Sequence, residues 1–262
     1  MFRINKIDRE LRWSKHLQNV VTKCRKSLNV IRVLAHHMWE AHPKTLLDVY
    51  KALILSRIDY GCCAYLTCDN SAMLGNLDKI QNLAIRYSLG AFPTSPVAAL
   101  HVEANILPLA LRRKQAAVNY YLKVISDERH PNHVSMAGAV PRRRLNRCRT
   151  LSQRAREDLT YLQLNDLDVA NETTVTRRTL VRARVYERWS DLWARSDSFL
   201  KRVKPDLGQL FLLGEGRFVF VKMFRIRLGH TALTHSALLE GKPRPLCANC
   251  EVNLTLEHIL CN

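Results

Sequence analysis

The first half of the chain repeats apolar residues at intervals of three and four positions, the period of one face of an α-helix. In the first such run these residues are Leu17, Val20, Val21, Cys24, Leu28, Ile31 and Leu34. Pro43 is suited to begin a second helix, Gly90 to end a third, and Pro108 to begin a further one. The same period returns near Thr174. Amphipathic helices bury their apolar faces against one another, so the pattern predicts a mostly α protein.

The helical period stops between His130 and Thr150. This interval contains Pro131, Gly138 and Pro141 and is rich in arginine. Its closely spaced arginines are Arg142, Arg143, Arg144, Arg147 and Arg149. We therefore divide the chain into a helical region over residues 1–127, a basic linker over 128–172, and a second helical region over 173–262.

The charge of the chain points to a polyanionic partner. Lys and Arg number 41 and Asp and Glu 23, which gives a formal net charge of +18 and a pI near 9.9. Nucleic acid is the commonest polyanion that attracts such a surface. A solubilising surface, or an acidic partner domain that the chain has lost, remains an alternative. The arginine run suits the first interpretation because the guanidinium fork matches phosphate geometry.

The cysteines and the apolar runs indicate a cellular compartment. Residues 1–12 are charged throughout, so they do not have the pattern of a signal peptide. No apolar run approaches the roughly 20 residues of a membrane span. We therefore expect an intracellular protein, in the nucleus or the cytoplasm, without a membrane partner. In a reducing compartment, clustered Cys and His favour a metal site over a disulfide.

The end of the chain has the spacing of a zinc site, Cys247-x2-Cys250-x7-His258-x2-Cys261. Three sulfurs and one imidazole suit tetrahedral Zn²⁺, and we expect a small structural knuckle over 247–261. His230 and His235 have no second ligand pair, so we expect packing or capping residues there. Asp59 beside Tyr60 is likewise expected to be a structural hydrogen-bonding group rather than a catalytic one.

Several ordered motifs resemble those of one family of proteins. In the N-terminal half they are Trp13 with His16, Ile58-Asp59-Tyr60-Gly61, Leu77 through Arg86, Gly90 through Pro96, and Pro108 through Arg113. In the C-terminal part they are Trp189 with Trp193, Val203-Lys204-Pro205, Arg225 through Thr231, Leu233-Thr234-His235, and the terminal Cys/His cluster. Together they resemble the C-terminal portion of a non-LTR (LINE-type, jockey-like) retrotransposon reverse transcriptase polyprotein.

The resemblance implies that residues 1–127 form a thumb-like helical bundle, which in an intact polymerase follows the palm and grips the template–primer duplex. It implies that an RNase H domain has been deleted at 128–172, and that the C-terminal helical region ends in a zinc knuckle. The family's usual spacing between the last two knuckle ligands is two residues longer than here. The polymerase's acidic Tyr-x-Asp-Asp motif is absent, so Mg²⁺ would serve only an intact polymerase and this chain alone is not expected to extend primers.

The sequence therefore predicts non-specific, phosphate-mediated binding of RNA or DNA by a reverse transcriptase fragment. The residues expected to contact nucleic acid are the five arginines of the linker together with Arg112 and Arg113. Two alternatives stay open. The chain is an inert relic of a decayed element, or it is a non-catalytic part of a larger active polyprotein in which it meets the polymerase palm.

Overall fold

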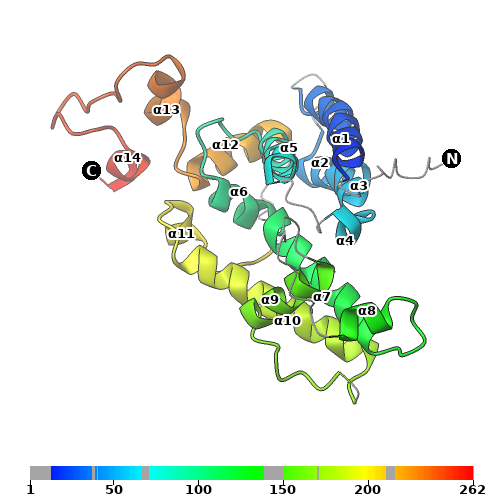
Figure 1. Ribbon diagram of the computed structural model, residues 1–262. Helices are drawn as coiled ribbons and strands as arrows, with labels where there is room; N and C mark the ends of the chain where they lie inside the picture. Colours follow the sequence, from blue (N-terminus) through cyan, green and yellow to red (C-terminus); the bar gives the residue numbers. More distant parts are fainter. Residues whose placement is uncertain are drawn as a thin grey trace. The chain divides into compact units, whose positions relative to one another are not determined.

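The computed structural model describes residues 13–36, 39, 41–65, 71–138, 150–169, 171–210 and 216–261. Most of these residues are helical and none belongs to a β-strand, which confirms the prediction of a mostly α protein. The elements in Figure 1 are α1 (Ser14–Leu34), α2 (Pro43–Tyr50), a π-helical turn η1 (Lys51–Leu55), α3 (Ser56–Asp59), α4 (Cys62–Tyr65), α5 (Ser71–Leu89), α6 (Val97–Ala104), α7 (Leu109–Ile125), α8 (His133–Ala137), α9 (Leu151–Tyr161), α10 (Thr174–Ala194), α11 (Leu200–Val203), α12 (Arg217–Arg227), α13 (Ala232–Leu239) and α14 (Leu256–Cys261). Within the described ranges, no helix has the length and apolar character needed to cross a membrane.

The chain divides into two compact units, each assembled from segments far apart in the sequence. Unit 1 contains residues 1–24, 56–78 and 107–191, and unit 2 contains residues 25–55, 79–106 and 192–262. Both units combine parts of the first predicted region with parts of the third. The units therefore do not test the predicted boundaries at residues 127 and 173, which remain a prediction from the sequence.

Several helices begin and end where local backbone chemistry favours it. Helix α2 begins at Pro43, whose fixed φ suits a first helical position and whose missing N–H needs no partner there. Helix α7 begins directly after Pro108. Helix α5 is followed by Gly90 in the left-handed region, with φ +65°. A Cβ atom at Gly90 would also lie 2.5 Å from a methyl group of Val221, so this position requires glycine for space as well as for conformation.

Two helices lie within the segment that the sequence assigns to a linker. Helix α8 covers His133–Ala137 and helix α9 covers Leu151–Tyr161. Helix α9 begins with a capping box, because the Gln153 amide donates to the Thr150 hydroxyl (3.2 Å) and the Thr150 amide donates to the Gln153 side chain (2.8 Å). The Thr-x-x-Gln signature of this start was present in the sequence. The dense arginines around it led to the linker interpretation.

Unit 1 is organised around α7, which packs against α4, α8 and α9 (Figure 1). Its buried side chains include Leu17, Val20, Ile58, Tyr65, Leu77, Leu109, Val118, Leu122, Ala155, Val181 and Trp189. Backbone carbonyls hold one buried guanidinium of this unit. The guanidinium of Arg177 donates to the carbonyls of Leu122 and Val169, both at 3.3 Å. These bonds tie α10 to the end of α7 and to the segment between α9 and α10.

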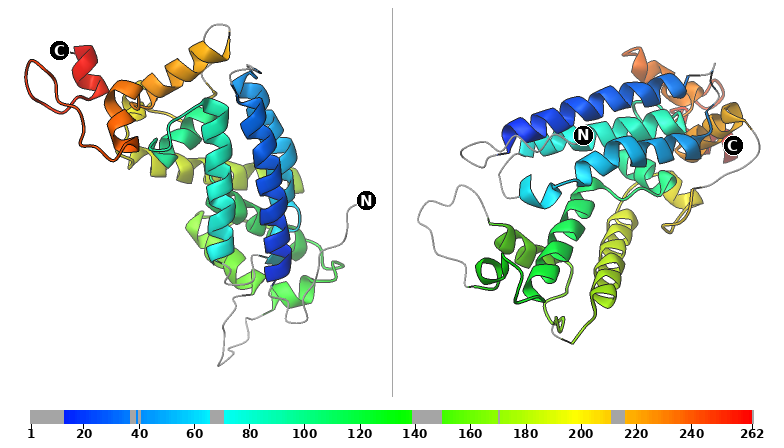
Figure 2. Two further views of the ribbon diagram at one scale, coloured as in Figure 1. Left: turned by 90° about the horizontal axis from the view of Figure 1, so that it is seen from above. Right: turned by 90° about the vertical axis from the view of Figure 1, so that its right-hand side faces the viewer.

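In unit 2, α2 lies beside the C-terminal parts of α1 and α5 (Figure 2). The buried faces of these helices include Leu28, Ile31, Leu46, Leu47, Tyr50, Ile54, Ile80, Ala84, Ile85 and Leu89. One polar pair is buried with them, since the Gln81 side-chain amide donates to the Tyr50 hydroxyl at 3.0 Å. The apolar period of the sequence therefore forms the core that it predicts in this unit.

Arg217 joins the ends of two helices of unit 2. This buried side chain opens α12 and donates to the carbonyls of Ala35 (3.1 Å), just after α1, and of Tyr87 (2.7 Å) and Ser88 (3.1 Å), in the last turn of α5. The last carbonyls of a helix lack partners within the helix and carry a partial negative charge. A single guanidinium thus supplies hydrogen bonds and positive charge to two helix C-termini.

A second buried cluster in unit 2 contains a fully buried carboxylate. Glu103 is 0% exposed and pairs with the Arg227 guanidinium through two contacts, Oε1–Nε at 2.6 Å and Oε2–Nη2 at 3.2 Å. The Lys204 ammonium lies 3.9 Å from the same carboxylate and donates to the carbonyls of Val102 and Gln209. These contacts connect α6, the segment after α11, and α12.

Candidate metal centre and nucleic-acid interface

The C-terminal cysteines stand on a short turn held by backbone hydrogen bonds. The amide of Cys247 donates to the carbonyl of Val252 (2.8 Å), and the amide of Glu251 donates to the carbonyl of Cys247 (3.0 Å). Glu251 adopts the left-handed conformation, with φ +55°, so the chain reverses directly after Cys250. The turn brings the two sulfur atoms together.

Helix α14 supplies the third donor of this group. The Thr255 hydroxyl accepts the amide of His258 at 3.1 Å, which caps the first turn of the helix and positions the imidazole. The Nε2 atom of His258 lies 3.3 Å from the sulfur of Cys250. The donor atoms of Cys247, Cys250 and His258 all lie within 4.8 Å of one another.

This spacing fits a metal ion. Tetrahedral ligation at a Zn–S distance of ~2.3 Å places neighbouring sulfur donors about 3.8 Å apart, within the spread of this group. Cys247, Cys250 and His258 can therefore hold a metal ion. Cys261 stands three positions after His258 in α14, but its side chain lies outside the described residues.

The local hydrogen bonds favour the metal-binding form of Cys247. The side chain of His258, followed by the backbone amides of Asn249 and Cys250, lowers the pKa of the Cys247 thiol to about 6. The thiolate is the form of cysteine that ligates metals. The lowered pKa therefore favours the ionised form of this sulfur.

The arginines expected to contact nucleic acid have different positions. Arg142, Arg143, Arg144, Arg147 and Arg149 lie outside the described residues. Arg112 forms a two-pronged ion pair with Asp59 at 2.7 and 2.6 Å, and Arg113 forms one with Asp78 at 2.8 and 3.1 Å. Both guanidinium forks are occupied by carboxylates of unit 1, which corrects the expectation that these two arginines contact nucleic acid. The structural role expected for Asp59 is confirmed.

An exposed basic face on α1 was not singled out from the sequence. It consists of Lys15, Asn19, Thr22, Lys23, Lys26 and Asn29, which recur at helical spacing and are all exposed. The whole helix contains no acidic residue. Among the described residues, none of these three lysines belongs to an ion pair. In the sequence, this face could be found from the polar positions opposite the apolar stripe and from the absence of Asp and Glu in this segment.

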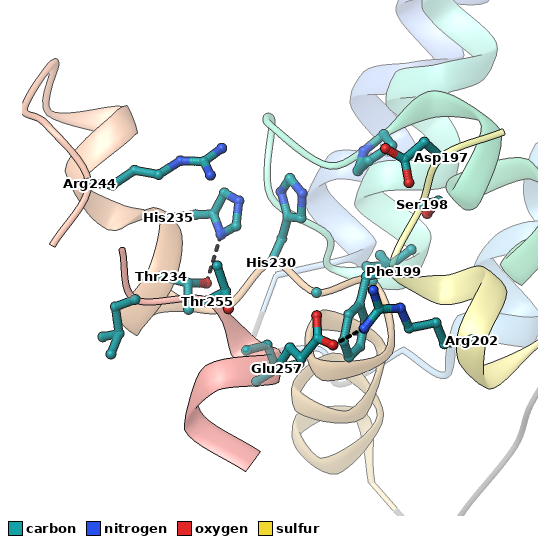
Figure 3. A pocket seen from close by; sticks show the side chains of 15 residues that line it. Asp197, Ser198, Phe199, Arg202, His230, Thr234, His235, Arg244, Thr255 and Glu257 are labelled. Carbon is teal, nitrogen blue, oxygen red and sulfur yellow. Dashed lines mark hydrogen bonds and ion pairs between the residues drawn. The ribbon is translucent and has the colours of Figure 1, made fainter. Parts of the chain in front are cut away.

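His230 and His235 pack against each other, as Figure 3 shows. Their ring centroids are 3.7 Å apart and their planes differ by 17°. The Nδ1 atom of His230 lies 3.1 Å from the Thr94 hydroxyl, and that of His235 lies 2.7 Å from the Thr234 hydroxyl. The expectation of packing residues is confirmed. The sequence does not predict the stacking itself, because the rings meet only when the turn at His230 and helix α13 have folded.

The comparisons with known proteins add no family to these observations. No protein-family model matches the chain, and no match was found among curated proteins or among solved structures.

Proposed function

We propose that this chain binds RNA or DNA through phosphate contacts, without sequence preference, and that the basic face of α1 is a principal contact surface. The observation that carries the proposal is the row of Lys15, Lys23 and Lys26 on a helix without acidic residues. Its setting is a chain of net charge +18. Lysine ammonium groups bind phosphates as point charges, which neutralises the backbone but does not distinguish bases.

The dimensions of this face suit a nucleic-acid strand. Lys15 and Lys26 are eleven residues apart in one helix, which corresponds to roughly 16 Å along its axis. Phosphates of one DNA strand repeat about every 3.4 Å along the duplex axis, so the three lysines can follow about five nucleotides. Asn19, Thr22 and Asn29 stand between and beside them and add neutral hydrogen-bonding groups.

The resemblance to a retrotransposon reverse transcriptase supports the same proposal. The motif Trp13-x-x-His16 opens α1, and the resemblance assigns this region to the thumb, which grips the template–primer duplex in an intact polymerase. We accordingly propose that the chain is a reverse transcriptase fragment that retains nucleic-acid binding and lacks the polymerase carboxylates. Primer extension by the purified chain should be absent.

Binding should weaken steeply with salt. Each neutralised phosphate adds roughly 0.9 to the slope of log affinity against log salt for duplex DNA, so three contacts weaken binding roughly fortyfold between about 50 mM and about 200 mM NaCl. Fluorescence anisotropy with labelled duplexes of unrelated sequence measures both the slope and the lack of sequence preference. An affinity that stays constant over this range would contradict the proposal.

We further propose that Cys247, Cys250 and His258 hold a structural Zn²⁺, with Cys261 as the fourth ligand. The chain purified in the presence of zinc should retain one ion after dialysis. Cys250→Ser should weaken zinc affinity in chelator competition by at least about tenfold, since even outer-shell changes at metal sites cost 10- to 100-fold. Cys63→Ser, a half-buried cysteine of α4 outside the group, is the matched control.

Cys261→Ser distinguishes a four-ligand site from a three-ligand one. A loss of affinity comparable to that of Cys250→Ser assigns Cys261 to the ion, whereas no change leaves three protein ligands. Equal zinc retention by the unmodified chain and by Cys250→Ser would contradict the site.

A further inference from the structure

Unit 2 contains a pocket beside the stacked histidines (Figure 3). Its cavity volume of about 430 Å³ falls in the range of roughly 300–1,000 Å³ that is typical of small-ligand sites. Its walls come from the residues before and within α11, the connection from α12 to α13, and the segments before and within α14. Segments far apart in sequence thus meet around one small volume.

One wall of the pocket presents donors. The Arg244 side chain lies beside the His235 ring, and the His235 ring stacks on His230 (Figure 3). The Thr94 and Thr234 hydroxyls face the Nδ1 atoms of these rings. When each hydroxyl donates to Nδ1, the ring proton resides on Nε2, and each imidazole has an N–H available on its other side. Arg244 forms no ion pair with any described carboxylate.

Ser198 supplies an unfulfilled polar group on the lining. Its hydroxyl oxygen is buried and has no hydrogen-bond partner among the described residues. A buried hydroxyl without a partner is costly, and such groups in native proteins commonly meet a water or a ligand. In Figure 3, Ser198 lies beside Asp197 on the side opposite Arg244, so this hydroxyl is not among the contacts of an anion beside Arg244.

The remaining charged groups leave this wall electropositive. Arg202 is paired with Glu257, which removes one charge of each sign. Asp197 is the other carboxylate of the lining, and in Figure 3 it lies on the side opposite Arg244. Burial, then the charges of His235 and Arg244, lowers the pKa of His230 to about 4, and burial, then the charge of Arg244, lowers the pKa of His235. Both shifts favour neutral rings beside this cation. A cationic ligand would meet Arg244 unfavourably, whereas an anion would relieve this repulsion.

We propose that this pocket binds a phosphate dianion, held by Arg244 and the two histidine Nε2–H groups. The volume admits more than the phosphate alone. A phosphomonoester at the end of a nucleic-acid strand and a free phosphate or mononucleotide share this chemistry. A phosphodiester inside a duplex does not, because its neighbours on both sides have to leave the pocket. The assignment to a strand end rests on the proposed nucleic-acid binding, whereas the anion site does not.

Sulfate is the first probe, because its charge is constant between pH 5 and pH 8. The full chain should bind one sulfate in NMR titrations that follow the imidazole signals of His230 and His235 at constant ionic strength. Arg244→Gln should weaken this binding by roughly tenfold to a hundredfold, the range for hydrogen bonds to charged groups. Arg195→Gln changes an exposed arginine that does not line the pocket and should leave sulfate affinity within about twofold.

The pH dependence of sulfate affinity gives a second, independent test. A bound dianion stabilises the protonated imidazoles and raises the lowered pKa of His230, so sulfate should bind more tightly as the pH falls from 7 to 5. One proton taken up per ion corresponds to at most about tenfold per pH unit. His230→Gln should remove this dependence. No sulfate binding, or binding that neither Arg244→Gln nor pH changes, overturns the proposal.

Comparing the binding of two oligonucleotides of one sequence, with and without a 5′-phosphate, identifies the phosphate-containing ligand of the pocket. Tighter binding of the phosphorylated strand, lost in Arg244→Gln, assigns the pocket to strand ends. Equal binding of both strands, together with sulfate binding, assigns it to free phosphate or a mononucleotide. Because sulfate is tested without nucleic acid, a failure of the anion site and a failure of the proposed function give different results.

Discussion

Glu103→Gln should lower the free energy of unfolding of the full chain by about 3–5 kcal/mol, measured by urea denaturation. The substitution keeps the size of the side chain and removes its charge. Arg227 and Lys204, each with a side chain 11% exposed, then lose this carboxylate. Burial already lowers the pKa of Lys204, while the Glu103 carboxylate raises it, which shows how far this ammonium depends on its partner.

Two comparisons separate this explanation from a general loss of ion pairing. Glu187→Gln breaks the Glu187–Arg184 pair on the exposed side of α10 and should cost less than about 1 kcal/mol. The double variant Glu103→Gln/Arg227→Gln removes one of the stranded charges and should regain part of the lost stability. If Glu103→Gln costs no more than Glu187→Gln, or the double variant is as unstable as the sum of the singles, uncompensated charge is not the cause.

The elements that could be predicted from the sequence are those that local chemistry determines. Pro43, Pro108 and Gly90 mark helix ends through their own backbone preferences, which hold in any tertiary context. The apolar period identifies buried faces for the same reason, and Leu17, Leu28 and Ile31 of the first run are all buried. Helix α9 could have been found from its capping box, whose spacing is equally local.

The polar cores could not be predicted, because their partners are far apart in the chain. Arg227 lies in a motif of the family resemblance, yet the sequence gives no indication that Glu103 is its partner, 124 positions earlier. Arg112 and Arg113 show the same limit. Their composition suggested phosphate contacts, and their engagement with Asp59 and Asp78 becomes visible only in the fold.

The candidate sites show the same difference between local features, which the sequence predicts, and long-range contacts, which it does not. Cys247, Cys250 and His258 lie close in sequence, so their spacing alone predicted a group that the turn and α14 bring within ligand distance. The pocket proposed to bind phosphate combines residues from the segment before α11 to α14, and no spacing rule connects His230 with Arg244. The basic face of α1 lies between these cases, since helical spacing was enough to find it once its polar side was considered.

Reversing the charge of the basic face should have the largest effect on nucleic-acid binding. The triple variant Lys15→Glu/Lys23→Glu/Lys26→Glu removes three phosphate contacts. At about 0.1 M salt each contact contributes roughly 0.9 in log affinity, so duplex DNA binding should weaken on the order of a hundredfold to a thousandfold. The salt slope should also fall by about 2.7. All three lysines are exposed, so thermal unfolding should change little.

A second triple variant with the same charge change tests whether the surface or the net charge is responsible. Lys44→Glu/Lys79→Glu/Lys222→Glu alters exposed lysines of α2, α5 and α12. Net charge acts at long range and is screened within about 10 Å at 0.1 M salt, so this variant should lose less than about tenfold and keep most of the salt slope. An equal loss in both variants would move the interface away from α1. Phosphate binding would then depend on overall charge or on Arg142 through Arg149. Only a local contact surface on α1 makes the two variants differ, because both sets of lysines are exposed and carry the same charge change.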